Sequence, residues 1–186
     1  TYKYVNEIRK ISPDNCCDNW RDAVIHANDV GYHTPADVQH DWAETSWFSV
    51  YLPEPNLVAW VYIVARPGVG AIVCDVEVID HIGRISLEAR YVDFQQHLPI
   101  PEKFEKFTLV NGLSLSTHNE PRDYKIDYIG VDDTEFHWDV KGLMEPFDIH
   151  DPEMDPLASH DPNESGFGSA YANHFDMTVK ITGKMK

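Results

Sequence analysis

Cysteine and positive charge are both scarce in this chain of 186 residues. Two of its three cysteines are neighbours in the sequence, and neighbours rarely bridge each other, so no disulfide framework is expected and a reducing, cytoplasmic compartment fits best. The 15 Lys and Arg residues stand against 31 Asp and Glu, which gives a formal net charge of −16. Such a charge repels phosphate backbones and anionic lipid headgroups, so nucleic acid and membrane surfaces are not expected as partners.

The sequence also lacks the long apolar run that a membrane-spanning helix requires, and its start, TYKYVNEIRK, holds no signal-peptide core. It contains no phosphate-binding glycine loop, nucleophile elbow or dinucleotide fingerprint, because RPGVGA has the wrong spacing and leads into a strand pattern. The motifs that signal a nucleotide cofactor are therefore absent.

What the chain does contain is a period-two alternation of apolar and polar residues from Ser46 onward. Residues 1–40 are expected to form a lead-in with one short amphipathic helix within DNWRDAVIHANDVG, where apolar residues recur at helical spacing before a glycine. Residues 41–186 are predicted to form one β domain. Its strand patterns number about eight in up-and-down order, which is typical of an antiparallel barrel or a strongly bent meander sheet.

Three segments add detail to this meander. Residues 84–94 and residues 71–80 have strand patterns that flank the turn DHIG, so they are predicted to pair as a tight antiparallel hairpin. Residues 144–170 hold four prolines, which predicts a long acidic loop of the kind that forms lids, binding loops or partner contacts. Its acids and histidines match no metal signature well, so a solvated loop is preferred and no metal is assigned. The last strand, 173–183, has an apolar face and no successor, so it is expected to be an edge that pairs with a second unit.

The first candidate site is the stretch HDWAETSWFSVYLP, which places an acid, Glu44, in an aromatic run. On a strand, Trp42, Glu44 and Phe48 share one face and Trp47 points to the other. An acid desolvated among aromatic side chains has a raised pKa and can donate a proton near neutral pH. The structural alternative is that Glu44 lies at the mouth of a sheet, bonded to Arg or to backbone amides.

Arg66 is the second candidate, because it ends a doubly apolar strand on the face of Trp60. It can neutralise Glu44 or bind an acidic or carbonyl group of a ligand, and the alternative is a strand-end arginine in solvent.

Two His–acid pairs complete the candidates. His118 and Glu120 are two residues apart, with Tyr124 just beyond, and can act as acid and base or hold a metal; the alternative is the wet face of an antiparallel strand. His174 and Asp176 repeat the spacing on the last strand and point either into a polar lumen or into water.

The order of four segments, HDWAETSWFSVYLPE, the strand ending in ARPGVG, LSTHNEPRDYKIDY and ANHFDMTVKITG, resembles the amino-terminal half of the lipocalin-related superfamily that includes hydroxyneurosporene synthase (carotenoid hydratase) and AttH-like proteins. The resemblance covers residues 38–183 and implies a molecule of two calycin/lipocalin-like barrels or half barrels. It further implies a hydrophobic ligand held between or inside them and no organic cofactor. Because the second unit is missing from this sequence, the chain is expected to be a fragment, or to pair with a second β-domain chain or in a homo-oligomer.

Members of that superfamily include hydratases of isoprenoid or isoflavonoid double bonds and pericyclases. The resemblance therefore implies a cofactor-independent hydratase, dehydratase or isomerase acting on a carbon–carbon double bond of a hydrophobic terpenoid or aromatic substrate. Glu44 is expected to donate the proton, and His118 or His174 to activate water. The remaining candidates are Asp176 for catalysis and, for substrate binding, Trp42, Trp47, Trp60, Arg66, Glu120 and Tyr124. The alternative, from another class, is a non-catalytic lipocalin-like carrier or accessory subunit that binds an apolar metabolite.

Overall fold

The computed structural model describes residues 2–8, 25–85, 88–149, 151, 153 and 173–186. Within them the chain forms one antiparallel sheet of 11 strands in the order β5-β4-β3-β2-β1-β11-β9-β8-β7-β6, with β10 paired to β11 off this path. The strands are β1 (Tyr2–Ile8), β2 (Glu44–Leu52), β3 (Leu57–Arg66), β4 (Ala71–Ile79), β5 (Tyr91–Pro99), β6 (Lys106–Thr108), β7 (Leu113–His118), β8 (Asp123–Ile129), β9 (Glu135–Gly142), β10 (Phe147–Asp148) and β11 (Asn173–Met185). The predicted all-β, lipocalin-like, strongly bent meander sheet is confirmed.

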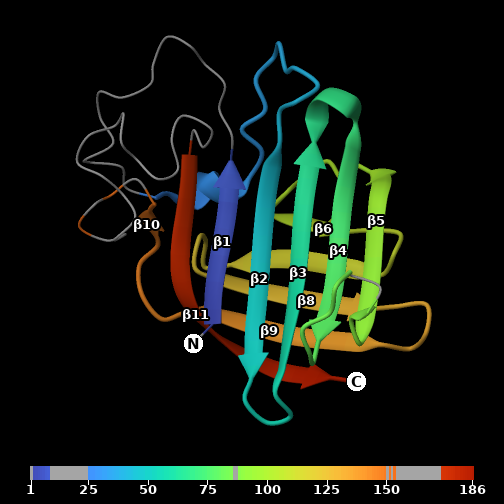
Figure 1. Ribbon diagram of the computed structural model, residues 1–186. Coiled ribbons are helices and arrows are strands. Elements are labelled where there is room, and N and C mark those ends of the chain that lie inside the picture. The colour runs from blue at the N-terminus through green and yellow to red at the C-terminus, as the bar shows by residue number, and fades with distance from the viewer. Residues whose placement is uncertain (1, 9–24, 86–87, 150, 152, 154–172) are drawn as a thin grey trace.

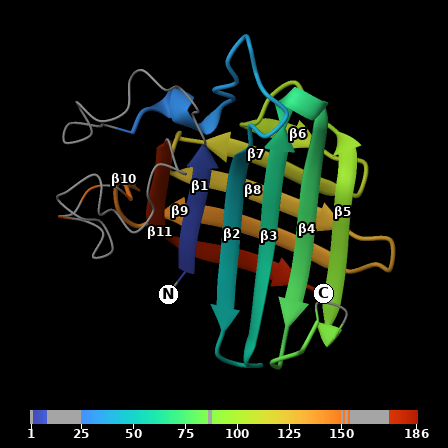
Figure 2. The same ribbon diagram turned by 45° about the horizontal axis from the view of Figure 1, so that its top comes forward.

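The sheet folds over itself into two layers (Figure 1). The front layer holds β1 to β5, and the strands of the rear layer, β6 to β9, run across it, as a second view also shows (Figure 2). One long strand, β11, belongs to both layers, because residues 173–179 pair with β1 and residues 179–185 pair with β9. The prediction that this strand is an unpaired edge is therefore wrong.

The core lies between the two layers and is filled by the inward side chains of both. In β3 every second residue from Leu57 to Ala65 is buried, and in β9 the buried residues are Phe136, Trp138 and Val140. Aromatic rings join the layers, as where Phe48 of β2 meets Tyr124 of β8 with ring centroids 5.2 Å apart. Each such side chain contributes roughly 1.5–3 kcal/mol when it is removed from water. The apolar half of the alternation therefore holds the layers together.

Some elements differ in detail from the sequence expectations. Tyr2–Ile8, placed in the lead-in, form β1 between β2 and β11. The predicted short helix falls mostly outside the described residues, and its described end, Ala27–Val30, is a 3-10 turn. The hairpin partner of β4 begins at Tyr91, after a connection of residues 80–90, so the hairpin is wider than predicted. The helical turns of the described residues are far too short to cross a bilayer.

Candidate functional site

Glu44, the expected proton donor, opens β2 and is completely buried. Its carboxylate accepts three hydrogen bonds, from the backbone N–H of His33 (2.9 Å), the hydroxyl of Thr34 (2.7 Å) and the indole N–H of Trp42 (2.9 Å). Both oxygens are thus engaged by the segment that precedes β2. Glu44 therefore anchors this segment to the end of the sheet. This agrees with the structural alternative in which Glu44 is bonded to backbone amides, and Trp42 is one of its hydrogen-bond donors.

The other predicted residues of the front layer lie on the side of the sheet that faces away from the core. Trp47 and Trp60 point away from the core, so they do not surround Glu44. Arg66 is exposed, and one guanidinium N–H donates to the carbonyl oxygen of His40 at 3.3 Å. The structure therefore separates Glu44 from Trp47, Trp60 and Arg66, and it keeps Trp42 beside the acid as a hydrogen-bond donor.

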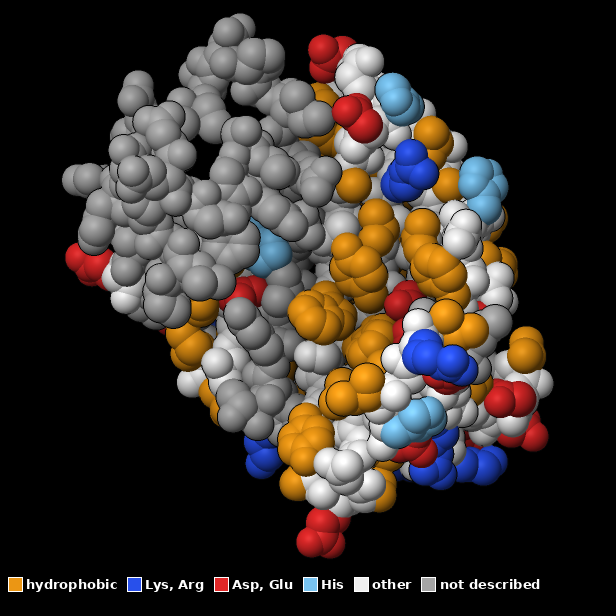
Figure 3. Space-filling model, viewed as in Figure 1, with side chains coloured by type: hydrophobic (Ala, Val, Ile, Leu, Met, Phe, Trp, Pro, Cys, Tyr) orange, Lys and Arg blue, Asp and Glu red, His pale blue; other side chains and the backbone are white. Residues whose placement is uncertain are grey.

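These outward side chains belong to a larger surface, here called the outer aromatic face (Figure 3). It consists of the apolar side chains of β2 to β5 that point away from the core: Trp47, Tyr51, Val58, Trp60, Tyr62, Val64, Val73, Ile79, Val92 and Phe94. Trp47, Tyr51 and Phe94 keep 39%, 45% and 53% of their surface exposed. A contiguous apolar surface of this kind marks a binding site more often than a solvated sheet.

Two acids of β4 lie within the outer aromatic face. Asp75 is in register with Tyr62 on one side and Phe94 on the other, and its Oδ2 accepts the indole N–H of Trp60 at 3.1 Å. Its Oδ1 is buried without a hydrogen-bond partner. Burial raises the pKa of the Asp75 carboxyl above its usual value, against the bond from Trp60, which lowers it, and with a smaller push from the charge of Asp93.

Glu77 lies two residues further along β4, in register with Trp60 and Val92. It is only 6% exposed, and among the described residues no hydrogen bond or ion pair joins it to a partner. Burial raises the pKa of its carboxyl, and the charge of Asp75 raises it further. An acid poised among aromatic rings, which the sequence suggested for Glu44, is therefore found at Asp75 and Glu77.

Sequence reasoning missed both acids. In AIVCDVEVID they occupy the polar half of the alternation, which is ordinarily the solvated side of a half-buried strand. The available signal was in the neighbouring strand, where Trp60 and Tyr62 occupy the same half. Pairing the two strands in register would have placed the acids beside the rings.

His174 and Asp176 form a buried pair on the outward side of β11, with His174 Nε2 3.3 Å from Asp176 Oδ1. They lie on the same side of the sheet as the outer aromatic face. Asp176, Val5 of β1, Trp47, Tyr62 and Asp75 occupy one row of strand partners. Four strand spacings of about 4.8 Å put the pair roughly 19 Å from Asp75.

His118, Glu120 and Tyr124 lie away from both groups. His118 ends β7 and its Nε2 is 3.3 Å from the hydroxyl of Ser116, while Glu120, in the following turn, accepts a bond from Thr117 at 3.0 Å. Tyr124 is buried in the core and donates its hydroxyl to the carbonyl of Pro121 at 2.7 Å. The predicted acid–base pair thus sits at an exposed turn, and the tyrosine packs the core.

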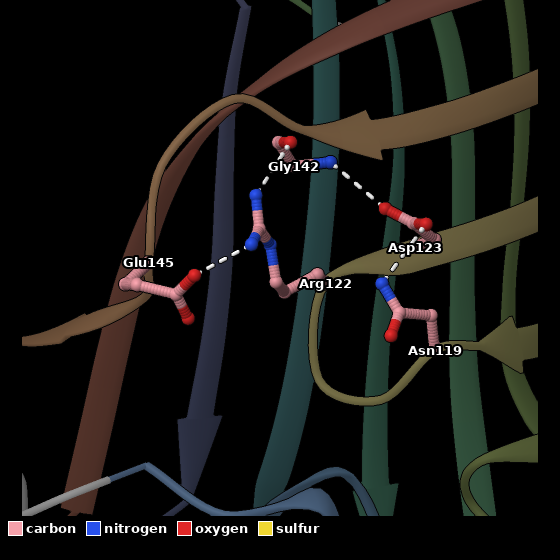
Figure 4. A network of polar contacts seen from close by, with 5 residues as sticks. All are labelled: Asn119, Arg122, Asp123, Gly142 and Glu145. Atoms are coloured by element: carbon pink, nitrogen blue, oxygen red, sulfur yellow. Dashed lines mark hydrogen bonds and ion pairs between the residues drawn. The ribbon is translucent and has the colours of Figure 1, made fainter.

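That turn is held by its own polar network (Figure 4). Arg122 pairs with Glu145 and donates to the carbonyl of Gly142 at 3.1 Å. Asp123 accepts from the N–H of Gly142 at 3.2 Å and from Asn119 at 3.3 Å. The network ties the β7–β8 turn to the end of β9, which gives these residues a structural role.

A second polar cluster joins the layers beside the edge strand β5. Asp93 accepts bonds from Tyr128 (2.8 Å) and Asn111 (3.1 Å), and the hydroxyl of Tyr128 is 2.5 Å from that of Tyr91. Burial and these bonds raise the pKa of Tyr128 well above its usual range. Burial also raises the pKa of the neighbouring Cys74 thiol to about 12, so this cysteine is not a nucleophile at neutral pH.

The rear layer carries an open groove with a volume of about 380 Å³, lined by Lys106, Phe107, Thr108, Ser114, Leu115, Ser116, Lys125 and Asp127. In the part of the chain that the structure describes, no three His, Cys, Asp or Glu side chains gather closely enough to hold a metal ion.

Comparison with protein-family models, with curated proteins and with solved structures found no match.

Proposed function

We propose that this chain belongs to a cofactor-independent enzyme that adds or removes water, or isomerises, at a carbon–carbon double bond of a hydrophobic terpenoid or aromatic substrate bound on the outer aromatic face. One observation carries the proposal: Asp75 and Glu77, whose pKa values are raised by burial, lie between aromatic side chains of the adjacent strands. Protonating an alkene requires a carboxylic acid kept neutral in an apolar site, and aromatic faces stabilise the resulting cation.

The geometry suggests a role for each acid. The bond from Trp60 occupies Asp75 Oδ2, so the acid proton is assigned to the buried, partnerless Oδ1, which a substrate reaches by displacing the aromatic side chains around it. Glu77 lies about 6.6 Å along the strand, close enough to take the proton of an attacking water. Two neighbouring carboxyl groups that differ in environment are a common way to place an acid beside a base. His174 and Asp176 lie too far from Asp75 to act on the same double bond.

A sheet face open to solvent does not exclude water by itself, and water exclusion strengthens both charge stabilisation and acid chemistry. The proposal therefore includes a cover over the outer aromatic face, either a second β-domain chain or another copy of this one. The large exposed fractions of Trp47, Tyr51 and Phe94 support a cover. A cytoplasmic setting is also part of the proposal, because the buried Cys74 is a free thiol.

The second candidate function is a non-catalytic carrier or accessory subunit that holds an apolar metabolite on the same face. It is favoured by the three donors that bind Glu44 within its own chain, since they remove the expected proton donor from any ligand. In that case the raised pKa values of Asp75 and Glu77 follow from their burial and from the charges of neighbouring acids, and they serve no reaction.

The test is turnover in heavy water. The chain is incubated with a panel of terpenoid alcohols, polyenes and phenolic aromatics, and mass spectrometry follows deuterium bound to carbon and gain or loss of water. Asp75→Asn should lower turnover at least about a hundredfold, the size of a general-acid effect, while binding persists. Asp139→Asn, which changes an exposed acid of the rear layer, is the matched control. Full turnover by Asp75→Asn contradicts the acid role, and binding without change of any ligand favours the carrier.

A further inference from the structure

Arg66 is the exception among the arginines that the structure describes. The other three, Arg84, Arg90 and Arg122, each pair with a carboxylate, namely Glu88, Asp80 and Glu145. Arg66 pairs with none in the described part of the chain, although the sequence holds 31 acids. One of its N–H groups donates to the carbonyl of His40, and the residue is exposed.

The position of Arg66 is fixed by close packing. The β3–β4 turn that follows it lies against residues 39 and 40, where a Cβ on Gly68 would come within 2.1 Å of the carbonyl oxygen of Gln39. The segment that holds Gln39 and His40 is in turn anchored by Glu44, through the bonds from Thr34 and Trp42. The buried acid thus serves to hold the carbonyl on which the guanidinium rests.

Arg66 also lies at one end of the outer aromatic face. It follows Trp60, Tyr62 and Val64 on the outward side of β3, and it is the only Lys or Arg in the described strands β2 to β5. Tyr62, which is in register with Asp75, is four residues from Arg66, or about 13 Å along the strand. An apolar surface with acids at its middle and one cation at its end matches a long amphipathic molecule.

We propose that Arg66 binds the terminal carboxylate of a hydrophobic carboxylic acid whose apolar body lies along Trp60, Tyr62 and Val64. This inference rests on the proposed function, because it names the class of substrate for the same face. Guanidinium binds carboxylate through parallel N–H donors in a fixed plane, and the contact with His40 leaves such donors available. Binding of the carboxylate at Arg66 fixes where the chain of the ligand lies on the outer aromatic face, and so determines the distance between its double bond and Asp75.

The test compares a polyene fatty acid with its methyl ester, which have the same apolar body. Binding of cis-parinaric acid and methyl cis-parinarate is measured by their fluorescence with the full chain. We expect the acid to bind about fivefold more tightly than the ester, as for a solvent-accessible ion pair. Arg66→Gln should abolish this ratio and leave the affinity for the ester unchanged, whereas Arg66→Lys should keep part of it. Arg84→Gln, which removes an exposed arginine already paired with Glu88, is the control.

The outcomes separate this inference from the proposed function. Equal affinities of the wild type for acid and ester, or an Arg66→Gln variant that weakens both probes alike, overturn the role of Arg66 and leave the face as a ligand site. If neither probe binds, the inference about Arg66 falls, while the proposed function still depends on the terpenoid and aromatic panel. If the probes bind and Trp60→Ala leaves both affinities unchanged, the outer aromatic face is not the site, and both proposals fall.

Discussion

Replacing Glu44 by Gln turns one of two buried acceptor oxygens into a donor. One oxygen accepts from Thr34 and Trp42 and the other from the backbone of His33, so in either orientation of the amide at least one donor faces an NH₂ group. Hydrogen bonds to a carboxylate contribute about 1.5–3 kcal/mol each, and a buried donor left without an acceptor costs a similar amount. We therefore expect the free energy of unfolding to fall by about 2–3 kcal/mol, which for a chain of this size lowers Tm by about 4–12 °C.

Urea unfolding followed by tryptophan fluorescence measures this change through the transition midpoint at constant slope. Glu102→Gln, an exposed acid with no partner among the described residues, is the control and should leave the midpoint unchanged. A loss below about 0.5 kcal/mol, the range of ordinary surface substitutions, would refute the anchoring role. The folded variant should retain turnover, because Glu44 binds its own chain and not the ligand. Loss of turnover without loss of stability would return Glu44 to the role of proton donor.

Three further substitutions test other parts of the structure. Asp75 and Glu77 have folded-state pKa values raised above 3.8 and 4.5, so the folded state binds more protons than the unfolded state and stability falls as pH rises through this window. Asp75→Asn should flatten that fall in urea midpoints measured across it, and an unchanged slope contradicts the raised pKa. Tyr128→Phe removes the hydroxyl bound to Tyr91 and Asp93 and should cost about 1–2 kcal/mol by the same assay; wild-type stability would show that the cluster does not tie the layers. At Gly183 φ is 146°, and a Cβ would lie 1.8 Å from the carbonyl oxygen of His137. Gly183→Ala should therefore weaken the β9–β11 pairing and lower the protection of its amides in hydrogen exchange. Unchanged protection there argues against the close approach.

Alternation along the strands predicted the fold because a period of two determines which side chains share a face. It placed Phe136, Trp138 and Val140 together, and all three are buried. It did not determine which face of an apolar strand is inside. In β3 both faces are apolar, so nothing within the strand distinguishes Trp60, which points outward, from Val61, which is buried in the core.

Pairing over long sequence distances accounts for the remaining differences. β1 lies between β2 and β11 and pairs with both through backbone hydrogen bonds, which do not depend on the identity of the side chains. Its sequence, YKYVNEI, therefore did not indicate a strand in the middle of the sheet. The sequence predicted an acid among aromatic rings at Glu44, and the structure places two further acids, Asp75 and Glu77, between aromatic side chains; the catalytic roles of all three stay predictions. Glu44 and Asp75 each lie beside a tryptophan. The register of β3 with β4 brings Asp75 next to the aromatic side chains of β3, and Asp75 is the acid with an oxygen that has no hydrogen-bond partner.

Strand β11 has a consequence for how the protein is made. The front strands β1 to β5 are complete once residue 99 has been synthesised, but the neighbour that closes β1 starts at residue 173. At about 5–20 residues per second, translating the intervening 74 residues (173 − 99) takes roughly 4–15 s. During that interval the nascent front sheet presents an open edge at β1, and part of its apolar inner side still lacks the rear strands. Chains growing side by side on one messenger can pair through that edge, so soluble yield should depend on translation speed and chaperone supply more than on the stability of the finished protein.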